Sequence, residues 1–278
     1  MRVLITGGGG LVATALVPRF DDVFALKHAA LDITDKAAVD AVFERLRPDL
    51  VINTAVAGVD VCERDPALAM AINVDGPANL AEAAARGRAA IVHFSSNYVF
   101  DGRPAKRKPY AIDDDAHPIN VYGKTKLAGE HAVAHACPRS FIVRTSWVFG
   151  QGKQSFLATV AQRLKRGESV EAISDTWAST TYVEDLATRV LEIISSGAHG
   201  THHVANEGIC SYETFARRAA ELCGVPQEIA ARLIGVVTEA DMKRVAPRPP
   251  WTPMHCQPPL RNWEEALASY LSVAPRSS

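Results

Sequence analysis

The first half of the chain alternates short, uninterrupted apolar segments with longer segments in which apolar residues recur at helical spacing. An apolar run without intervening polar residues is typical of a strand that is covered on both faces. Strands that alternate with helices form β-α-β units, in which the strands are parallel and the crossovers are right-handed. The sequence therefore predicts an α/β fold built on a doubly wound parallel sheet.

The same patterns place the individual elements along the chain. The expected strands cover 2–6, 23–27, 50–53, 90–94 and 141–144. The expected helices cover 11–20, 36–46, 66–86, 121–135, 155–166, 183–195 and 262–271. The second half is less regular, which indicates a smaller C-terminal lobe beside a Rossmann-like first domain.

One segment of that second half, 246–259, is so rich in proline that it cannot form a regular helix. We expect either a binding loop or an irregular strap that covers other structure. Three basic residues lie in or just before this segment, Lys243, Arg244 and Arg248. They either meet a substrate pyrophosphate or form a plain basic surface.

Four consecutive glycines, Gly7 to Gly10, follow the first expected strand and open the first expected helix. Read as GxxGxxA, the turn places Gly7, Gly10 and Ala13 at the three positions that a dinucleotide-binding turn constrains. There the turn must be tight, the backbone must approach a pyrophosphate, and the helix must pack close to the strand. The start of the helix also offers unpaired N–H groups to phosphate. This turn predicts binding of a dinucleotide.

The second expected strand ends at Lys27 and His28, where an NAD-binding fold usually carries a carboxylate for the ribose 2′-hydroxyl. Basic side chains at this point instead attract a 2′-phosphate. The sequence therefore favours NADP(H), weakly, over NAD(H), which stays open. Asp32 and Ile33 follow at once and are candidates for contact with the adenine.

Tyr122 and Lys126 form a YxxxK pattern on an expected helix, where residues four apart share one face. An ammonium group near a phenol favours the phenolate, so we expect Lys126 to lower the pKa of Tyr122 and fit it for proton exchange. Ser96 lies at the end of the preceding apolar strand, the edge at which ligands bind in open α/β sheets. Its hydroxyl is suited to orient a reacting oxygen.

The order of these features resembles the extended short-chain dehydrogenase/reductases, and within them the dTDP-4-dehydrorhamnose reductases. The resemblance covers nearly the whole chain. Its motifs are Arg47-Pro48-Asp49-Leu50-Val51-Ile52-Asn53, Ala71-Ile72-Asn73-Val74, Ser95-Ser96-Asn97-Tyr98-Val99-Phe100-Asp101-Gly102, Asn120-Val121-Tyr122-Gly123-Lys124-Thr125-Lys126-Leu127-Ala128-Gly129-Glu130 and Arg144-Thr145-Ser146-Trp147-Val148-Phe149-Gly150.

The resemblance implies a role for each matching position. Ser96, Tyr122 and Lys126 would form the catalytic triad, and Asn97 and Trp147 would touch the sugar. The expected cofactor contacts are Gly7, Gly10, Leu11, Val12, Lys27, Asp32, Ile33, Ala55, Val56, Ala57, Tyr122 and Lys126. The NAD(P)-binding domain would comprise 1–150 with about 176–200, and the substrate-binding lobe 151–175 and 201–278. The family usually has Ser-Thr-Asp where this chain has Ser95-Ser96-Asn97.

The expected activity is NAD(P)H-dependent reduction of the 4-keto group of a nucleotide-activated deoxysugar. Three alternatives stay open: epimerisation or dehydration of a nucleotide sugar, reduction of a non-sugar carbonyl in secondary metabolism, and a non-catalytic NADP-binding regulatory subunit. The complete Ser96, Tyr122 and Lys126 set argues against the regulatory subunit, since a binding module does not need it.

Composition narrows the range of partners. The formal net charge is −1, which predicts neither nucleic-acid nor anionic-membrane binding. Five cysteines without a CxxC pair indicate reduced thiols. We find no signal peptide and no long uncharged apolar stretch, and so expect a cytoplasmic protein. A homodimer stays open. His131 and His135 lie one helical turn apart but lack a third ligand, so no metal site is predicted.

Overall fold

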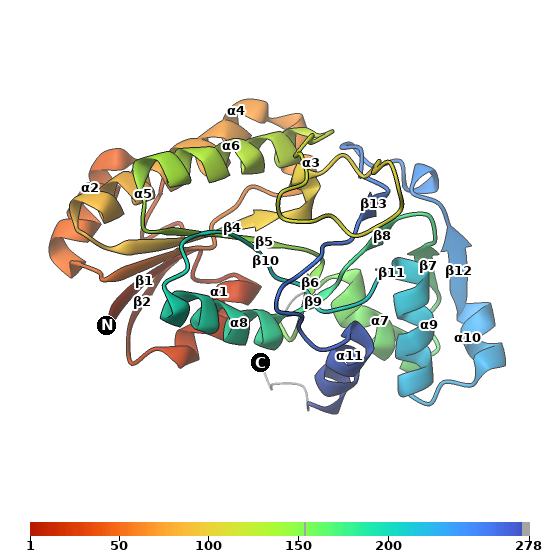
Figure 1. Cartoon of the computed structure of the whole chain (residues 1–278). Coiled ribbons are helices and arrows are strands. Elements are labelled where there is room, and N and C mark those ends of the chain that lie inside the picture. Colours follow the sequence, from red (N-terminus) through yellow and green to blue (C-terminus); the bar gives the residue numbers. More distant parts are fainter. Residues whose placement is uncertain (153, 274–278) are drawn as a thin grey trace.

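Six parallel strands form the central sheet of the computed structural model, which describes residues 1–152 and 154–273 (Figure 1). The strand order is β10-β5-β4-β3-β1-β2. The strands are β1 (Arg2–Thr6), β2 (Asp22–Leu26), β3 (Leu50–Asn53), β4 (Ala90–Ser96), β5 (Ser140–Thr145) and β10 (Gly200–His203). The order reverses at β1, which pairs with β2 on one side and β3 on the other. In such sheets ligands bind outside the carboxyl ends of the strands at this switch point.

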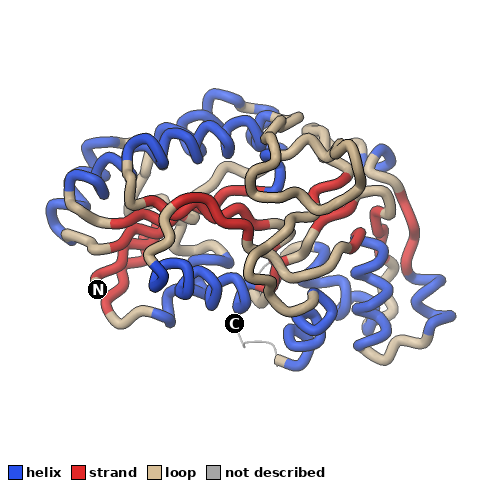
Figure 2. The backbone as a smooth tube through the Cα atoms, viewed as in Figure 1, coloured by secondary structure: helices blue, strands red, loops and turns tan. Residues whose placement is uncertain are grey.

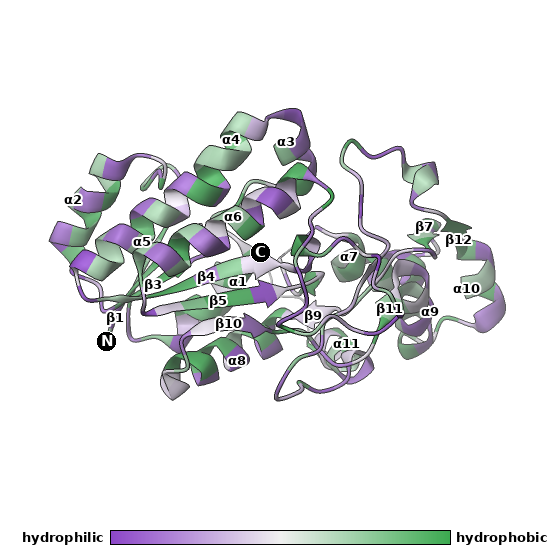
Figure 3. Ribbon diagram, turned by 45° about the horizontal axis from the view of Figure 1, so that its top comes forward, coloured by the Kyte–Doolittle hydropathy of each residue, from purple (hydrophilic) through white to green (hydrophobic). Residues whose placement is uncertain are grey.

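Helices cover both faces of the sheet, because successive side chains of each strand point to opposite faces. Val3 and Ile5 belong to one apolar core with α1 (Leu11–Leu16) and α8 (Val183–Ser196). Leu4, between them, belongs to a second core that contains side chains of the helices on the other face. Those helices are α2 (Lys36–Leu46), α5 (Gly76–Arg86) and α6 (Val121–Ala136). Figure 3 shows the outcome: strands such as β4 and β5 are largely hydrophobic, whereas the helices are hydrophobic along one side. The predicted doubly wound α/β fold is confirmed.

The single helix expected over 66–86 is interrupted. It consists of α4 (Pro66–Met70), a π-helical turn (Ala71–Asp75) and α5. The fully buried Asn73 lies in this turn, where its side chain accepts a hydrogen bond from the Ala57 N–H and donates one to Thr125 Oγ1. π-Helical turns are frequent at functional sites.

Two further local differences from the expected elements lie in the first domain. The helix expected over 11–20 ends at Leu16 and continues as a 3₁₀ turn (Val17–Arg19), because Pro18 has no N–H to donate. An additional short helix, α3 (Val59–Arg64), precedes α4 and was not expected.

Besides α8, the second half adds small sheets and further helices beside the carboxyl edge of the main sheet (Figure 1). The strands are β6 (Val148–Phe149), β7 (Val170–Ile173), β8 (Trp177–Ala178), β9 (Thr181–Tyr182), β11 (Cys210–Ser211), β12 (Ile234–Val237) and β13 (Trp251–Thr252). The helices are α7 (Phe156–Lys165), α9 (Tyr212–Leu222), α10 (Gln227–Leu233) and α11 (Trp263–Ser272). The lobe boundaries given above stay a proposal, and the pairing of β10 with β5 supports extending the first lobe to residue 203.

The proline-rich segment 246–259 runs as a strap along the long loop between β4 and α6 (Figure 2). The Tyr110 N–H donates to Pro253 O at 2.8 Å, and the His255 N–H donates to Tyr110 O at 2.8 Å. Gly102 has φ +76° and lies so close to the strap that a Cβ there would be 2.8 Å from Pro249 and Pro250. Apart from the short strand β13, the segment is thus held by backbone hydrogen bonds to the loop.

Candidate active site

A cavity of about 440 Å³ opens at the carboxyl ends of β4 and β5. Its walls come from both halves of the chain, since the main sheet and α6 form one side, and α7, α9 and the approach to the strap form the other. Its lining residues are Val59, Ser95, Ser96, Asn97, Tyr98, Tyr122, Thr145, Ser146, Trp147, Val148, Ser155, Phe156, Leu157, Tyr212 and Arg244. The structure thus brings four of the expected catalytic and sugar-contacting residues, Ser96, Asn97, Tyr122 and Trp147, to one cavity.

Ser96 is the last residue of β4 and caps the 3₁₀ turn at Asn97–Val99. Its Oγ accepts a hydrogen bond from the Tyr98 N–H at 3.1 Å and donates one to Asn97 Oδ1 at 3.2 Å. The Asn97 side chain in turn donates to Thr252 Oγ1 in β13 at 2.6 Å. The amide of Asn97 therefore links Ser96 to the strap.

Helix α6 brings Tyr122 to this serine by close backbone packing. Asn120 caps the helix, because its Oδ1 accepts a hydrogen bond from the Gly123 N–H at 2.7 Å. Its Nδ2 donates to Pro247 O at 2.8 Å, which fixes the strap to the start of the helix. A Cβ at Gly123 would lie 2.1 Å from Tyr98 O, so only glycine lets the helix come this close.

Burial controls the protonation of Tyr122 and Lys126. It raises the pKa of Tyr122 to about 12, and a hydrogen bond with Ser96 opposes this rise. It lowers the pKa of Lys126 to about 8, against the nearby Glu130, which favours the ammonium. The structure therefore differs from the expectation that Lys126 lowers the pKa of Tyr122. The reason is that both groups are buried, and burial favours the neutral phenol and the neutral amine.

The glycine-rich turn forms a cradle at the switch point of the sheet. Gly7 has φ +69°, in the left-handed region that favours glycine. A Cβ there would lie 2.8 Å from Ala55 N, in the loop after β3. A Cβ at Gly8 would lie 2.7 Å from the backbone of Ala25. Gly9 and Gly10 are exposed at the start of α1, where Gly10 is the N-cap without a side-chain cap. Exposed backbone at a helix start suits a phosphate, so these residues fit the pyrophosphate of a dinucleotide.

Three of the expected cofactor residues, Lys27, Asp32 and Ile33, lie in the segment that follows β2. The exposed Lys27 extends beside Gly9, where a Cβ would lie 3.5 Å from Lys27 Cε. The Asp32 carboxylate accepts hydrogen bonds from the Thr34 N–H at 2.9 Å and from its hydroxyl at 2.8 Å, and these bonds lower the pKa of Asp32. Ile33 is buried and packs against Gly76. Lys27 thus places a positive charge beside the cradle, whereas the side chain of Ile33 is buried in the loop.

The loop after β3 is held by two buried asparagines. Asn53 Oδ1 accepts a hydrogen bond from the Ala55 N–H at 3.1 Å, and Asn73 Oδ1 accepts one from the Ala57 N–H at 2.9 Å. Between these anchors Val56 is half exposed, while Ala57 is buried. The backbone of residues 55–57, which were expected to line the cofactor, is therefore held by buried side-chain hydrogen bonds at both ends.

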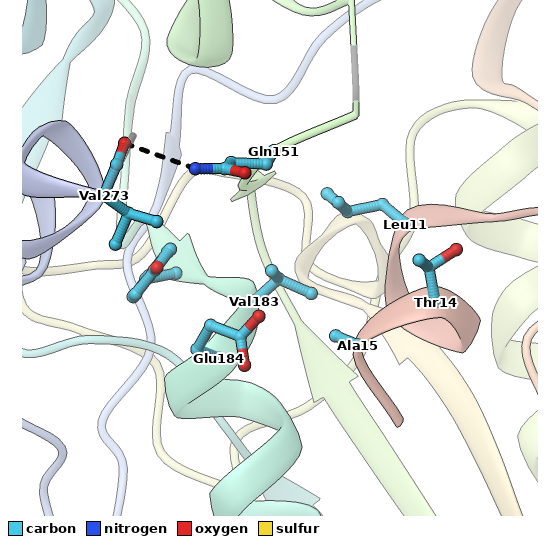
Figure 4. A pocket seen from close by; sticks show the side chains of 8 residues that line it. Leu11, Thr14, Ala15, Gln151, Val183, Glu184 and Val273 are labelled. Carbon is cyan, nitrogen blue, oxygen red and sulfur yellow. Dashed lines mark hydrogen bonds between the residues drawn. The ribbon is translucent and has the colours of Figure 1, made fainter. Parts of the chain in front are cut away.

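The side chain of Leu11 points away from the cradle. Figure 4 shows Leu11 facing Val183 of α8 across a cavity of about 40 Å³, and both Leu11 and Val12 pack against the larger apolar core. The two residues therefore offer backbone rather than side chain to a phosphate.

Trp147 adopts φ +41°, and its ring stacks on Tyr212 with centroids 4.0 Å apart. A backbone of this kind costs about 1–3 kcal/mol and is typical of functional sites.

Sequence reasoning missed several residues that build the site. Three of them are asparagines within the motifs of the resemblance, to which no role was assigned: Asn53, Asn73 and Asn120. The fourth is His93, which lies inside an apolar strand. A polar side chain within an apolar run was the signal that the sequence offered for His93.

Two of the basic residues near the strap have different surroundings. Arg244 lines the cavity and pairs with Glu239 at 3.4 Å, whereas Arg248 is buried against Asp60 at 2.9 Å.

Metal-binding geometry is absent from the part of the chain that the structure describes: no three His, Cys, Asp or Glu side chains are grouped for an ion. His131 and His135 are exposed on the far part of α6. Within residues 1–152 and 154–273, no helix has the length and apolar character that crossing a bilayer requires.

A glycine-rich cradle at the switch point, with serine at the end of β4 and the YxxxK pair on α6, defines an extended short-chain dehydrogenase/reductase, an NAD(P)H-dependent oxidoreductase. Residues 1–274 match the family model described as RmlD substrate binding domain, and the chain belongs to this family.

Relatives and solved structures agree with this assignment. The chain is 38% identical to a dTDP-4-dehydrorhamnose reductase of Mycobacterium tuberculosis, over all of this chain and 94% of that protein. It is 34% identical to the crystal structure of a dTDP-4-dehydrorhamnose reductase from Clostridium acetobutylicum, with a TM-score of 0.89 and 98% of each chain covered. The Bacillus anthracis dTDP-4-dehydrorhamnose reductase in complex with NADP has a TM-score of 0.88 at 30% identity, covering 97% of this chain and 98% of that one.

Proposed function

We propose that this enzyme reduces the 4-keto group of a nucleotide-activated deoxysugar, with dTDP-4-dehydrorhamnose as the first substrate to test. The observation that carries the proposal is the convergence of Ser96, Tyr122 and Trp147 on one cavity beside the glycine-rich cradle. The full-length similarity to reductases with this substrate in their names supports the choice of sugar.

The residues have distinct tasks in this mechanism. Ser96 donates a hydrogen bond to the carbonyl oxygen of the sugar and orients it. Tyr122, whose pKa is raised to about 12 by burial, holds its proton at neutral pH and donates it to that oxygen. For Lys126, one turn further along α6, we propose contact with the cofactor ribose. Bound NAD(P)H supplies the hydride.

The two ends of the substrate meet different parts of the cavity. We propose that Trp147 and Asn97 contact the sugar ring, and that Arg244 faces the diphosphate. Arg244 is suited to this because it lines the cavity and pairs with Glu239 through Nε at 3.4 Å, while the terminal NH₂ groups of a guanidinium can also donate to phosphate oxygens. Asn97 is already bonded to Thr252, so its contact with the sugar follows the position of the strap.

The cofactor is proposed to be NADP(H) in preference to NAD(H), because the exposed Lys27 lies beside Gly9 and no carboxylate ends β2. Five free cysteines, four of them buried, suit a reducing compartment, and we propose the cytoplasm. A homodimer remains a proposal that light scattering on the purified protein tests.

The deciding experiment follows NADPH and NADH oxidation with dTDP-4-dehydrorhamnose for the wild type, Tyr122→Phe and a control, Tyr270→Phe. We expect turnover with the wild type and a loss of about 10²–10⁴-fold in kcat for Tyr122→Phe, the contribution typical of a positioned acid. Tyr270 donates to Ala158 O outside the cavity, so its variant keeps turnover. Cofactor binding without turnover would refute this substrate. It would favour reduction of another carbonyl compound or a regulatory role. Retained, unconsumed cofactor with interconverted sugars would identify an epimerase.

A further inference from the structure

Glu130 and Arg144 form a buried ion pair behind the candidate active site. Arg144 Nη2 donates to Glu130 Oε2 at 2.7 Å, and Arg144 Nε donates to Glu130 Oε1 at 2.9 Å. Glu130 is 4% exposed and Arg144 is 7% exposed, so water screens neither charge. Two side-by-side hydrogen bonds of this kind fix the relative direction of the two groups as well as their distance.

The pair connects the strand that ends in Ser96 to the helix that carries Tyr122. Arg144 of β5 is the register partner of Ser95 in β4, and the Ser95 hydroxyl donates to Glu130 Oε1. Ser95 directly precedes Ser96 in the chain. Glu130 lies about two turns beyond Tyr122 on α6, so the two side chains share one face of the helix.

An aromatic ring also contacts the guanidinium of Arg144. The central carbon of this guanidinium lies 5.4 Å over the ring of Phe100, which stacks on Tyr110 with centroids 4.1 Å apart. The backbone of Tyr110 pairs with the strap. The ion pair is therefore in contact with the structure that the second half of the chain builds around the cavity.

Stability alone does not account for two charges at this place. Removing charged groups from water is costly, and an apolar pair of similar size is often at least as stable. Arg144 Nη1 adds to this cost, because it has no hydrogen-bond partner among the described residues. The charged pair differs from an apolar one in having a single bonded geometry, whereas apolar side chains can slide past each other. This difference points to a role in alignment.

We propose that Glu130 and Arg144 are positioning residues. Their buried pair holds α6 on β4 at the separation at which Tyr122 and Ser96 meet the same oxygen of the substrate. Neither Glu130 nor Arg144 lines the cavity, so they act through the Ser95 hydroxyl and the backbone of α6. The consequence for turnover rests on the proposed function, whereas the alignment of Tyr122 with Ser96 does not.

The test replaces both partners with apolar side chains, in the full-length double variant Glu130→Met with Arg144→Met. We expect this variant to unfold in urea at about the same concentration as the wild type. In protein with ¹³Cζ-labelled tyrosine, the NMR signal of Tyr122 should nevertheless move as it does in Ser96→Ala, which removes the hydrogen bond between the two side chains. Tyr122→Phe assigns that signal.

Turnover provides the second measurement on the double variant. With dTDP-4-dehydrorhamnose and NADPH we expect kcat to fall by about 10²-fold, the effect of a small misplacement of reacting groups, while KM for NADPH stays unchanged. A merely structural pair would predict the opposite, since its replacement by a stable apolar pair would leave both kcat and the Tyr122 signal as in the wild type.

Arg144→Lys is a further variant that keeps a positive charge beside Glu130. A lysine is a point charge without the planar fork of arginine, so the fold should persist while part of the alignment is lost. We expect the Tyr122 signal to move in the same direction and kcat to fall less than in the double variant. The control is Arg218→Met with Glu264→Met, an ion pair of 2.7 Å between α9 and α11 outside the cavity, which should change neither measurement.

A folded double variant with the Tyr122 signal and the kcat of the wild type would overturn the proposal. If the double variant does not fold, Arg144→Lys decides in its place, and a wild-type signal together with a wild-type kcat would again overturn it. If the Tyr122 signal moves as expected but the wild type turns over no keto sugar, the proposed function fails and the positioning role stands.

Discussion

Burial opposes the positive charge that Lys126 carries at neutral pH. Its side chain is among the largest that are fully enclosed, and burial lowers its pKa to about 8 from 10.5. The folded protein therefore binds its proton less tightly than the unfolded chain, which costs stability at every pH below about 8. As pH rises from about 8 to 10.5 the unfolded chain also loses this proton, and the cost disappears.

Lys126→Met should consequently stabilise the fold while it removes catalysis. At pH 7 we expect a gain of about 3 kcal/mol in the free energy of unfolding, falling to about 1 kcal/mol at pH 10. Urea unfolding at both pH values measures it. Lys124→Met, at an exposed position on the same helix, is the matched control and should change little. A gain of equal size at both pH values would contradict the assigned pKa.

At the scale of elements, α6 is positioned by two backbone contacts on either side of Lys126. Gly123 packs on Tyr98 O and Gly129 packs on Asn73 O. The second contact involves the π-helical turn, so the irregular backbone at Asn73 and the glycine in α6 form one joint. Small shifts of this joint would move Tyr122 relative to Ser96.

Gly129→Ala tests this joint. Its Cβ would lie 2.2 Å from backbone, so the helix must move, and we expect a loss of about 1–3 kcal/mol in stability together with reduced kcat. Gly87→Ala at the end of α5 meets no contact shorter than 3.4 Å and has negative φ, so its stability should remain within about 0.5 kcal/mol of wild type. Thermal unfolding and turnover of both variants give the comparison; an unaffected Gly129→Ala would show that α6 can slide freely.

At the scale of the whole molecule, the two halves meet around the cavity and are tied together by the strap. Arg248 of the strap bonds the Asp60 carboxylate of α3, and Asn120 of α6 donates to Pro247 O. The cradle lies on the first half alone, whereas the cavity needs both. Cofactor binding is therefore expected to stabilise the chain without any sugar present.

Adding NADPH at about 100 times its Kd should raise the free energy of unfolding by about 2.7 kcal/mol. For a chain of this size the Tm then rises by roughly 5 °C. NADH at the same concentration should give a smaller rise, and Lys27→Ala should remove most of the difference. Lys165→Ala, a lysine on α7 away from the cradle, serves as control. Equal shifts with both cofactors in the wild type would refute the preference for NADP(H).

Much of the fold was predictable because strand and helix periods are local properties of the sequence. The positions of the main strands, the glycine-rich turn and the YxxxK spacing follow from residues close in the chain. The family could be inferred for the same reason, since its motifs are contiguous. The interruption at Ala71–Asp75 could not, because it depends on Asn73 reaching both Ala57 and Thr125.

The sequence by itself determined the order of the main strands and helices and placed the glycine-rich turn, Ser96 and the YxxxK pair on them. These local patterns indicated the class of chemistry. Only the tertiary structure decided the protonation of these residues. Burial of Tyr122 and Lys126 reversed the expected direction of the tyrosine pKa. Protonation depends on desolvation and on partners brought together by folding, and neither is a local property of the chain.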